Sequence, residues 1–186
     1  MILLISTNKE SLHYYEFVKP IEYILKKDKI KFFTRQYKNI TKKDLEKASK
    51  VIICGTSLKD FDYFNHINEF AWLKHFNKPL LGICAGMQIT THFFDGQIWG
   101  SGKKIDNRKE IGQTPVIFKK EFLGLKGNIN AYELHQVGIR KVRKNFDIFA
   151  QSNKGLQAIK HKSKEIYGVL FHPEVRNKEL ISSFAN

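Results

Sequence analysis

Three residues that follow two predicted strands have the types needed for nucleophilic catalysis. Cys84 follows the apolar run 79–83 and has a glycine two positions before it and two positions after it. His172 and Glu174 follow a second apolar run, 166–171, and have one proline between them. A cysteine, a histidine and a carboxylate can act as nucleophile, base and orienting group. The sequence therefore predicts a cysteine-based catalytic site if the fold brings the two segments together.

The segment around Cys84 has the pattern of a nucleophile elbow, a sharp strand-to-helix turn that exposes a reactive side chain. Gly82 and Gly86 leave room for such a turn. The N-terminus of the next helix favours a thiolate over a thiol, and the N–H of Ala85 would face an oxyanion formed on an attacked carbonyl. Gln88 lies one helical turn after Cys84, so the two share a helix face. Taken alone, the segment also fits a buried core cysteine.

The proline between His172 and Glu174 restricts how these two side chains can be oriented. A residue before proline is restricted to extended backbone, so Glu174, two positions on, projects toward the same side as His172. Its carboxylate can orient the imidazole and stabilise the protonated form. The alternative is a strand-end histidine in a surface turn. Because ligands bind at the carboxyl edge of parallel sheets, we expect Cys84 and His172 to meet there.

The elements that would position these residues follow an α/β pattern. Strands are expected at 1–5, 30–33, 50–54 and 79–83, and helices at 11–27, 41–48, 60–76 and 85–94. Strands buried on both faces that alternate with helices indicate a mostly parallel central sheet with helices on both faces. Past residue 100, shorter strands at 114–118, 138–142 and 157–160 indicate an antiparallel extension of one side of that sheet. A strand at 166–171 and a helix at 178–184 complete a single domain over residues 1–186.

Composition limits the classes of function. The chain has 186 residues, 42% hydrophobic and 13% aromatic, which is typical of a folded globule with a sizeable core. No apolar run reaches membrane-spanning length, and the first five residues are too short for a signal-peptide core, so we expect a cytoplasmic protein without membrane contact. Two cysteines favour one reactive thiol over a disulfide framework or a zinc cluster, and no metal site is predicted.

The net charge of +14 does not by itself identify a partner. A scattered lysine-rich surface is the simpler interpretation. A basic surface for nucleic acid or for an acidic protein stays open, although nucleic acid is not favoured because lysine far outnumbers arginine and base recognition prefers arginine.

Two motifs of this chain resemble the signatures of class I (triad-type) glutamine amidotransferases. These are Gly82-Ile-Cys-Ala-Gly-Met-Gln88 and Phe171-His-Pro-Glu174, in matching order and separation. Within the family, the stretch Ile166–Val175 is most similar to the glutaminase portion of GMP synthases, as is Gly155–His161. Glu110-Ile-Gly112 resembles a family segment beyond the elbow helix. The resemblance covers the whole chain and implies a flavodoxin-like class I glutamine amidotransferase fold.

The resemblance also implies a reaction and a set of site residues. Cys84 would attack the side-chain amide of glutamine, His172 would protonate the departing ammonia and then activate water, and Glu174 would orient His172. Gln88 matches a position that contacts the bound glutamine. The loop Leu134-His-Gln-Val137, with Gln136 and Val137, lies where family backbones hold the substrate's amino and carboxylate groups. The other six histidines show no comparable pattern and are expected in surface or core positions.

One turn departs from the family pattern. Relatives usually have Gly-Gly-Pro or a similar turn after the strand that precedes the elbow, which supplies a second oxyanion donor, whereas this chain has Cys54-Gly-Thr-Ser57. The N–H of Gly55 or Thr56 could still serve because the donor is main chain. A β-branched Thr56 resists positive φ, so we expect a different turn here.

The expected function is a glutaminase that uses no cofactor and supplies ammonia to a separate ATP-dependent synthetase subunit, such as that of GMP synthesis. The chain has no phosphate-binding Gly-x-x-x-x-Gly-Lys-Ser/Thr motif and no room for a synthetase domain, which is why a separate partner is expected. Two alternatives stay open. One is a γ-glutamyl peptide hydrolase or another cysteine hydrolase of the same fold, and the other is a catalytically impaired binding or regulatory module.

Overall fold

The computed structural model describes residues 1–94, 97–98, 109–142 and 144–186. The strands are β1 (Ile2–Ser6), β2 (Phe32–Gln36), β3 (Lys50–Ile53), β4 (Leu80–Ile83), β5 (Gln97–Ile98), β6 (Glu110–Phe122), β7 (Leu125–His135), β8 (Ile139–Lys141), β9 (Phe146–Gln151), β10 (Leu156–His161) and β11 (Ile166–Val169). The helices are α1 (Ser11–Phe17), α2 (Lys19–Lys27), η1 (Tyr37–Asn39), α3 (Lys42–Lys47), α4 (Asp62–Asn65), η2 (Ile67–His75), α5 (Ala85–Phe93) and α6 (Glu179–Ala185), of which η1 and η2 are 3₁₀ helices.

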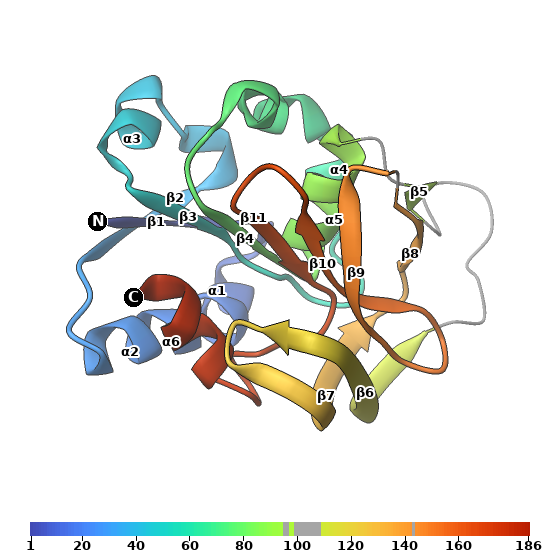
Figure 1. Ribbon diagram of the computed structural model, residues 1–186. Coiled ribbons are helices and arrows are strands. Elements are labelled where there is room, and N and C mark those ends of the chain that lie inside the picture. The colour runs from blue at the N-terminus through green and yellow to red at the C-terminus, as the bar shows by residue number, and fades with distance from the viewer. Residues whose placement is uncertain (95–96, 99–108, 143) are drawn as a thin grey trace.

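A nine-stranded sheet runs through the protein in the order β2-β1-β3-β4-β11-β10-β9-β6-β7. The first five strands are mutually parallel. The last four continue the sheet in antiparallel pairs on one side, as the sequence predicts (Figure 1). The segment 138–142, expected in this extension, is an exception, because β8 instead pairs with β5 in a separate two-stranded sheet.

Helices cover both faces of the parallel half of the sheet (Figure 1). Alternate side chains of β1 show the two layers. Ile2 and Leu4 pack in one core with residues of α2 and α6, whereas Leu3 and Ile5 pack in a second core with residues of η2 and α5. A strand buried on both faces in this way is characteristic of a parallel sheet between helices. Among the described residues, no helix is long and apolar enough to cross a lipid bilayer.

Two predicted helices are interrupted. The segment 11–27 divides into α1 and α2 at Val18, because Pro20 stands in the first turn of α2 and its ring is incompatible with a continuous helix. The segment 60–76 divides into the short α4 and the 3₁₀ helix η2. Asn65 and His66 have low helix propensity, and His66 Nδ1 lies 3.0 Å from the Asp62 carbonyl oxygen at the break. By contrast, Thr41 is the N-cap of α3 and forms a capping box with Asp44, which explains why this helix begins where the sequence predicts.

The antiparallel part contains two strands that the sequence does not predict, β7 and β9, and β6 is far longer than the expected 114–118. The last strand also ends earlier than expected, at Val169 in place of Phe171. Leu170 N–H donates to the Gln157 carbonyl (2.9 Å), and His172 N–H donates to the Tyr132 carbonyl of β7 (2.8 Å). The chain therefore leaves β11 toward β7, and this places His172 between the two halves of the sheet.

Candidate active site

Cys84 lies in a strained turn between β4 and α5. Its backbone has φ 48° and ψ −104°, in a region that residues with a side chain rarely adopt. The two flanking glycines make the turn possible. A Cβ on Gly82 would come within 2.5 Å of the Gly86 carbonyl oxygen, and one on Gly86 would come within 2.1 Å of the Ile53 carbonyl oxygen. The segment thus has the backbone geometry of a nucleophile elbow.

His172 and Glu174 form a buried pair just beyond the end of β11, the strand adjacent to β4. Nδ1 of His172 lies 2.8 Å from Oε1 of Glu174, and the two residues are 0% and 1% exposed. The ring of His172 also packs on Phe17 with 5.2 Å between ring centroids. Because Nδ1 faces the carboxylate, Nε2 is the nitrogen left to exchange a proton, and it has no hydrogen-bond partner among the described residues.

Gly55 shows how closely Cys84 and His172 approach each other. A Cβ built on Gly55 would lie 2.6 Å from His172 Cε1 and 3.3 Å from Cys84 Cβ. All three residues follow the carboxyl ends of neighbouring parallel strands, β3, β4 and β11. The structure therefore brings together the two sequence segments that carry the predicted triad.

The charges of this site favour an imidazolium. Burial would lower the pKa of His172, but the Glu174 carboxylate and the adjacent Cys84 outweigh burial, so the pKa of His172 is raised well above its ordinary value. A histidine that stays protonated next to a cysteine is the electrostatic condition for a thiolate–imidazolium pair.

Three backbone N–H groups close to Cys84 in the structure are free to bind a developing negative charge. Those of Gly55, Thr56 and Ala85 donate no hydrogen bond to any of the described residues. The sequence suggested that a positive φ at Thr56 would be costly, because threonine is β-branched. Thr56 does not adopt a positive φ. Instead, its hydroxyl donates to Asp60 Oδ2 (2.8 Å), and Thr7 Oγ1 donates to the Gly55 carbonyl (3.2 Å), so side chains fix the turn.

Cys84 lies in the wall of a small cleft, and most of the predicted substrate-binding residues line it. Gln88 is buried and doubly bound, because its amide donates to the Val137 carbonyl (2.7 Å) and its oxygen accepts from the Tyr63 hydroxyl. Gln136 donates to the Leu58 carbonyl (3.1 Å) across the cleft. The predicted residues in its wall are Thr56, Cys84, Ala85, Gln88, Gln136 and Val137.

The sequence missed two features of this region. One is Tyr63, which holds Gln88. The other is a buried cluster of Glu110, Glu133 and His135, whose potential ligand atoms all lie within 4.8 Å of one another, close enough to hold a metal ion. The sequence offered one signal for it, the alternation Glu133-Leu-His135, which places two ionisable side chains on one face of a strand.

Comparisons with known proteins agree with this geometry. The family model for glutamine amidotransferase class-I matches residues 14–184. The glutamine-hydrolysing GMP synthase subunit of Pyrococcus furiosus is 33% identical over 147 residues, 76% of each chain. The corresponding subunit of Sulfolobus acidocaldarius is 32% identical over 172 residues, 80% of this chain and 89% of that one. For the Pyrococcus abyssi subunit, 38% identical over 108 residues, this chain spans about half the relative's length (55%).

Solved structures share the fold over nearly the whole chain. A Thermoplasma acidophilum protein described as a GMP synthase subunit superposes with a TM-score of 0.80 at 20% identity, covering 100% of this chain and 94% of the other. A glutamine amidotransferase of Thermotoga maritima gives a TM-score of 0.68 at 19% identity, covering 98% and 81%. The family model and the sequence relatives establish the assignment: this chain belongs to the class-I glutamine amidotransferases, a family of enzymes with a cysteine nucleophile.

Proposed function

We propose that the chain is a glutaminase that hydrolyses glutamine to glutamate and ammonia through Cys84, His172 and Glu174. The observation that supports this most strongly is the buried His172–Glu174 pair beside a cysteine in an elbow turn, because this arrangement unites nucleophile, base and orienting group. The family to which the chain belongs supports glutamine as the substrate.

The proposed reaction has two halves. The Cys84 thiolate attacks the side-chain amide carbon of glutamine, and the resulting tetrahedral intermediate collapses when Nε2 of the His172 imidazolium gives its proton to the departing ammonia. This leaves a γ-glutamyl thioester on Cys84 and a neutral His172. His172 then takes a proton from water, the resulting hydroxide attacks the thioester, and the sulfur leaves as thiolate with release of glutamate. Glu174 orients the imidazole and stabilises its charge in both halves.

The remaining site residues would bind the substrate. The N–H of Ala85, together with that of Gly55 or Thr56, would receive the oxyanion, since none of the three is engaged by a described residue. Gln88 and the backbone of Gln136 and Val137 would hold the amino-acid end of glutamine. We infer that residues 1–186 act in this way as a single domain.

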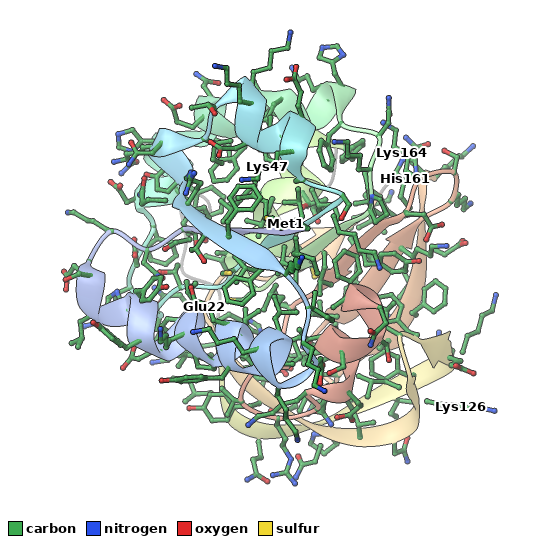
Figure 2. The ribbon with its side chains drawn as sticks, turned by 90° about the vertical axis from the view of Figure 1, so that its left-hand side faces the viewer. Met1, Glu22, Lys47, Lys126, His161 and Lys164 are labelled. Carbon is green, nitrogen blue, oxygen red and sulfur yellow. The ribbon has the colours of Figure 1, made fainter. Side chains whose placement is uncertain are left out.

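We further propose that the ammonia passes to a separate ATP-dependent synthetase subunit, and that this subunit uses it in GMP synthesis. Supporting this, the relatives from Pyrococcus furiosus and Sulfolobus acidocaldarius are glutamine-hydrolysing subunits of GMP synthase. Nucleic acid is not favoured as the partner, because lysine far outnumbers arginine in the sequence. In the view of Figure 2, Lys47 and Lys126 lie well apart on the molecule.

A glutaminase assay tests the proposal. Ammonia and glutamate release from glutamine are measured for the wild type and for Cys84→Ala, each alone and together with any ATP-dependent synthetase that a pull-down from the source cell recovers. We expect activity in the wild type and none in Cys84→Ala. His92→Gln, at an exposed histidine at the far end of α5, is the control and should leave activity in place. Cleavage of γ-glutamyl peptides without release of ammonia from glutamine, in the presence of the synthetase, would assign the site to a peptide hydrolase instead.

A further inference from the structure

A buried carboxylate holds the turn that follows β3, residues 54–57. This turn carries the backbone N–H groups of Gly55 and Thr56, which are the candidate oxyanion donors on this side of the site. Oδ2 of Asp60 accepts from the Thr56 hydroxyl (2.8 Å) and from the backbone N–H of Lys9 (2.8 Å). Asp60 is 8% exposed. One carboxylate oxygen therefore ties the turn to the loop between β1 and α1.

The same loop holds the turn at a second place. Oγ1 of Thr7, a fully buried residue, lies 3.1 Å from the Cys54 carbonyl oxygen and 3.2 Å from the Gly55 carbonyl oxygen, and it donates to both. The backbone N–H of Asp60 donates to the Ser57 carbonyl (3.1 Å) and closes the turn. These contacts engage carbonyl oxygens of the turn and leave the two candidate oxyanion donors free.

The turn has little room to shift without disturbing the site. It lies in the cleft wall together with Asp60 and Cys84, and a Cβ built on Gly55 would lie 2.6 Å from His172 Cε1. Residues 54–57 contain no proline whose ring would restrict the backbone, so contacts from neighbouring segments must fix it. An oxyanion donor has to lie about 2.7–3.1 Å from the charged oxygen, so a small displacement of the turn would weaken it.

We propose that Asp60 is a positioning residue for the oxyanion site: through the Thr56 hydroxyl and the Lys9 N–H, it keeps the N–H groups of Gly55 and Thr56 directed toward the oxygen of a carbonyl that Cys84 attacks. This inference rests on the proposed function in that Cys84 is the nucleophile. Asp60 itself touches no reacting atom. Its effect therefore belongs to the step in which negative charge develops on the carbonyl oxygen.

Two reactions of Cys84 separate this role from a general loss of structure. In glutamine hydrolysis the carbonyl oxygen becomes an oxyanion, and Asp60→Ala should lower the turnover number by about 10²-fold, the lower end of the usual cost of losing one oxyanion donor. KM should stay unchanged, because the oxyanion exists only beyond the ground state. Alkylation by iodoacetamide, in which the Cys84 thiolate displaces iodide and no oxyanion forms, should keep its wild-type rate.

Two further variants serve as controls. Asp60→Asn should recover most of the turnover number, because its side-chain oxygen can take the place of Oδ2 and accept both hydrogen bonds. Asp44→Ala removes a second buried aspartate with the same kind of contacts, since Oδ2 of Asp44 accepts from the hydroxyl (2.7 Å) and the backbone N–H (3.0 Å) of Thr41. Asp44 caps α3, which contributes none of the described cleft-lining residues. This variant should lower Tm and keep wild-type turnover.

Wild-type turnover in a folded Asp60→Ala would overturn the inference, and so would a parallel loss of alkylation, which would indicate a collapsed site. If Asp60→Ala does not fold, Thr56→Val removes the hydroxyl that Asp60 holds. The same fall in turnover is then expected, and wild-type turnover would again refute the role of Asp60.

A measurement without glutamine keeps this inference separate from the proposed function. If the wild type releases no ammonia even with its synthetase, the proposed function fails, and NMR order parameters of the Gly55 and Thr56 amides decide the role of Asp60. They should be about 0.85 in the wild type, as for rigid backbone, and below about 0.6 in Asp60→Ala, or in Thr56→Val if the former does not fold. Order parameters that do not change would overturn the inference.

Discussion

Nδ1 of His172 and Oε1 of Glu174 lie 2.8 Å apart, and both residues are buried. A carboxylate placed in this way fixes which nitrogen of the imidazole faces Cys84 and compensates the charge that the ring acquires when it is protonated. The Glu174 carboxylate therefore both orients the His172 ring and stabilises its positive charge.

Glu174→Gln should reduce glutamine hydrolysis by about 10²–10⁴-fold, the usual contribution of a positioned acid–base group. The neutral amide cannot stabilise an imidazolium, so the pKa of His172 should fall and fewer molecules should hold the thiolate–imidazolium pair. The turnover number, measured by ammonia release, checks this. Glu179→Gln, a change at an exposed glutamate at the start of α6, should keep wild-type turnover. Equal turnover in the two variants would remove Glu174 from the mechanism.

Gly55→Ala should abolish most of the activity, because the new methyl group would lie 2.6 Å from His172 Cε1 and 3.3 Å from Cys84 Cβ. Moving either side chain by a fraction of an ångström to an ångström costs about 10²-fold in rate. Thermal unfolding should also show a loss of about 1–3 kcal/mol from overpacking. Gly155→Ala is the matched control, since a Cβ at Gly155 meets no atom within 4 Å. If both alanine variants behave like the wild type, His172 and Cys84 do not approach each other as closely as described.

Tyr63→Phe should weaken glutamine binding while leaving chemistry intact. The Tyr63 hydroxyl donates to the Gln88 side-chain oxygen, which keeps the Gln88 amide aimed at the Val137 carbonyl. Loss of one such hydrogen bond costs about 1 kcal/mol, or about fivefold, which we expect in KM and not in the turnover number. Tyr23→Phe, at a tyrosine that is 61% exposed, should change neither. A drop in turnover with constant KM would place Tyr63 in the chemical step instead.

The sequence predicts the elbow and the His-Pro-Glu pair because their signals are local. Gly82, Gly86 and Pro173 act on backbone within a few residues, and burial on both faces marks the parallel strands directly. The strands of the antiparallel half have weaker local sequence signals. β7 alternates buried and more exposed positions along its whole length, with Lys126 and Asn128 among the latter, so it does not form the continuous apolar run by which the parallel strands are recognised.

The alternation Glu133-Leu-His135 is a local signal for two members of the buried cluster, but the third member could not be predicted from it. Glu110 and His135 are distant in sequence and become neighbours only through the register of β6 and β7. That register depends on long-range pairing, which no local pattern encodes. The same limit applies to Tyr63, which reaches Gln88 from the short helix α4.

The stability of the protein should fall as the pH rises from about 6.5 to about 9, and His135 should account for part of this fall. Its pKa is raised to about 9 in the folded protein from an ordinary value of 6.5. The folded state binds this proton more tightly than the unfolded state does. The resulting stabilisation is complete below pH 6.5, the ordinary pKa of histidine, and is lost as the pH rises through the folded-state pKa of about 9.

Calorimetry at about pH 6.5 and about pH 9.5 measures the effect as a difference in Tm. The wild type and His92→Gln should lose more Tm over this interval than His135→Gln, which has no proton to release at this site. The comparison between variants matters because lysines and tyrosines also begin to titrate near the upper pH, and their contribution is common to all three proteins. If His135→Gln loses as much Tm as the wild type, no proton is held between Glu110 and Glu133. His135 then does not carry the positive charge that the geometry of the cluster indicates.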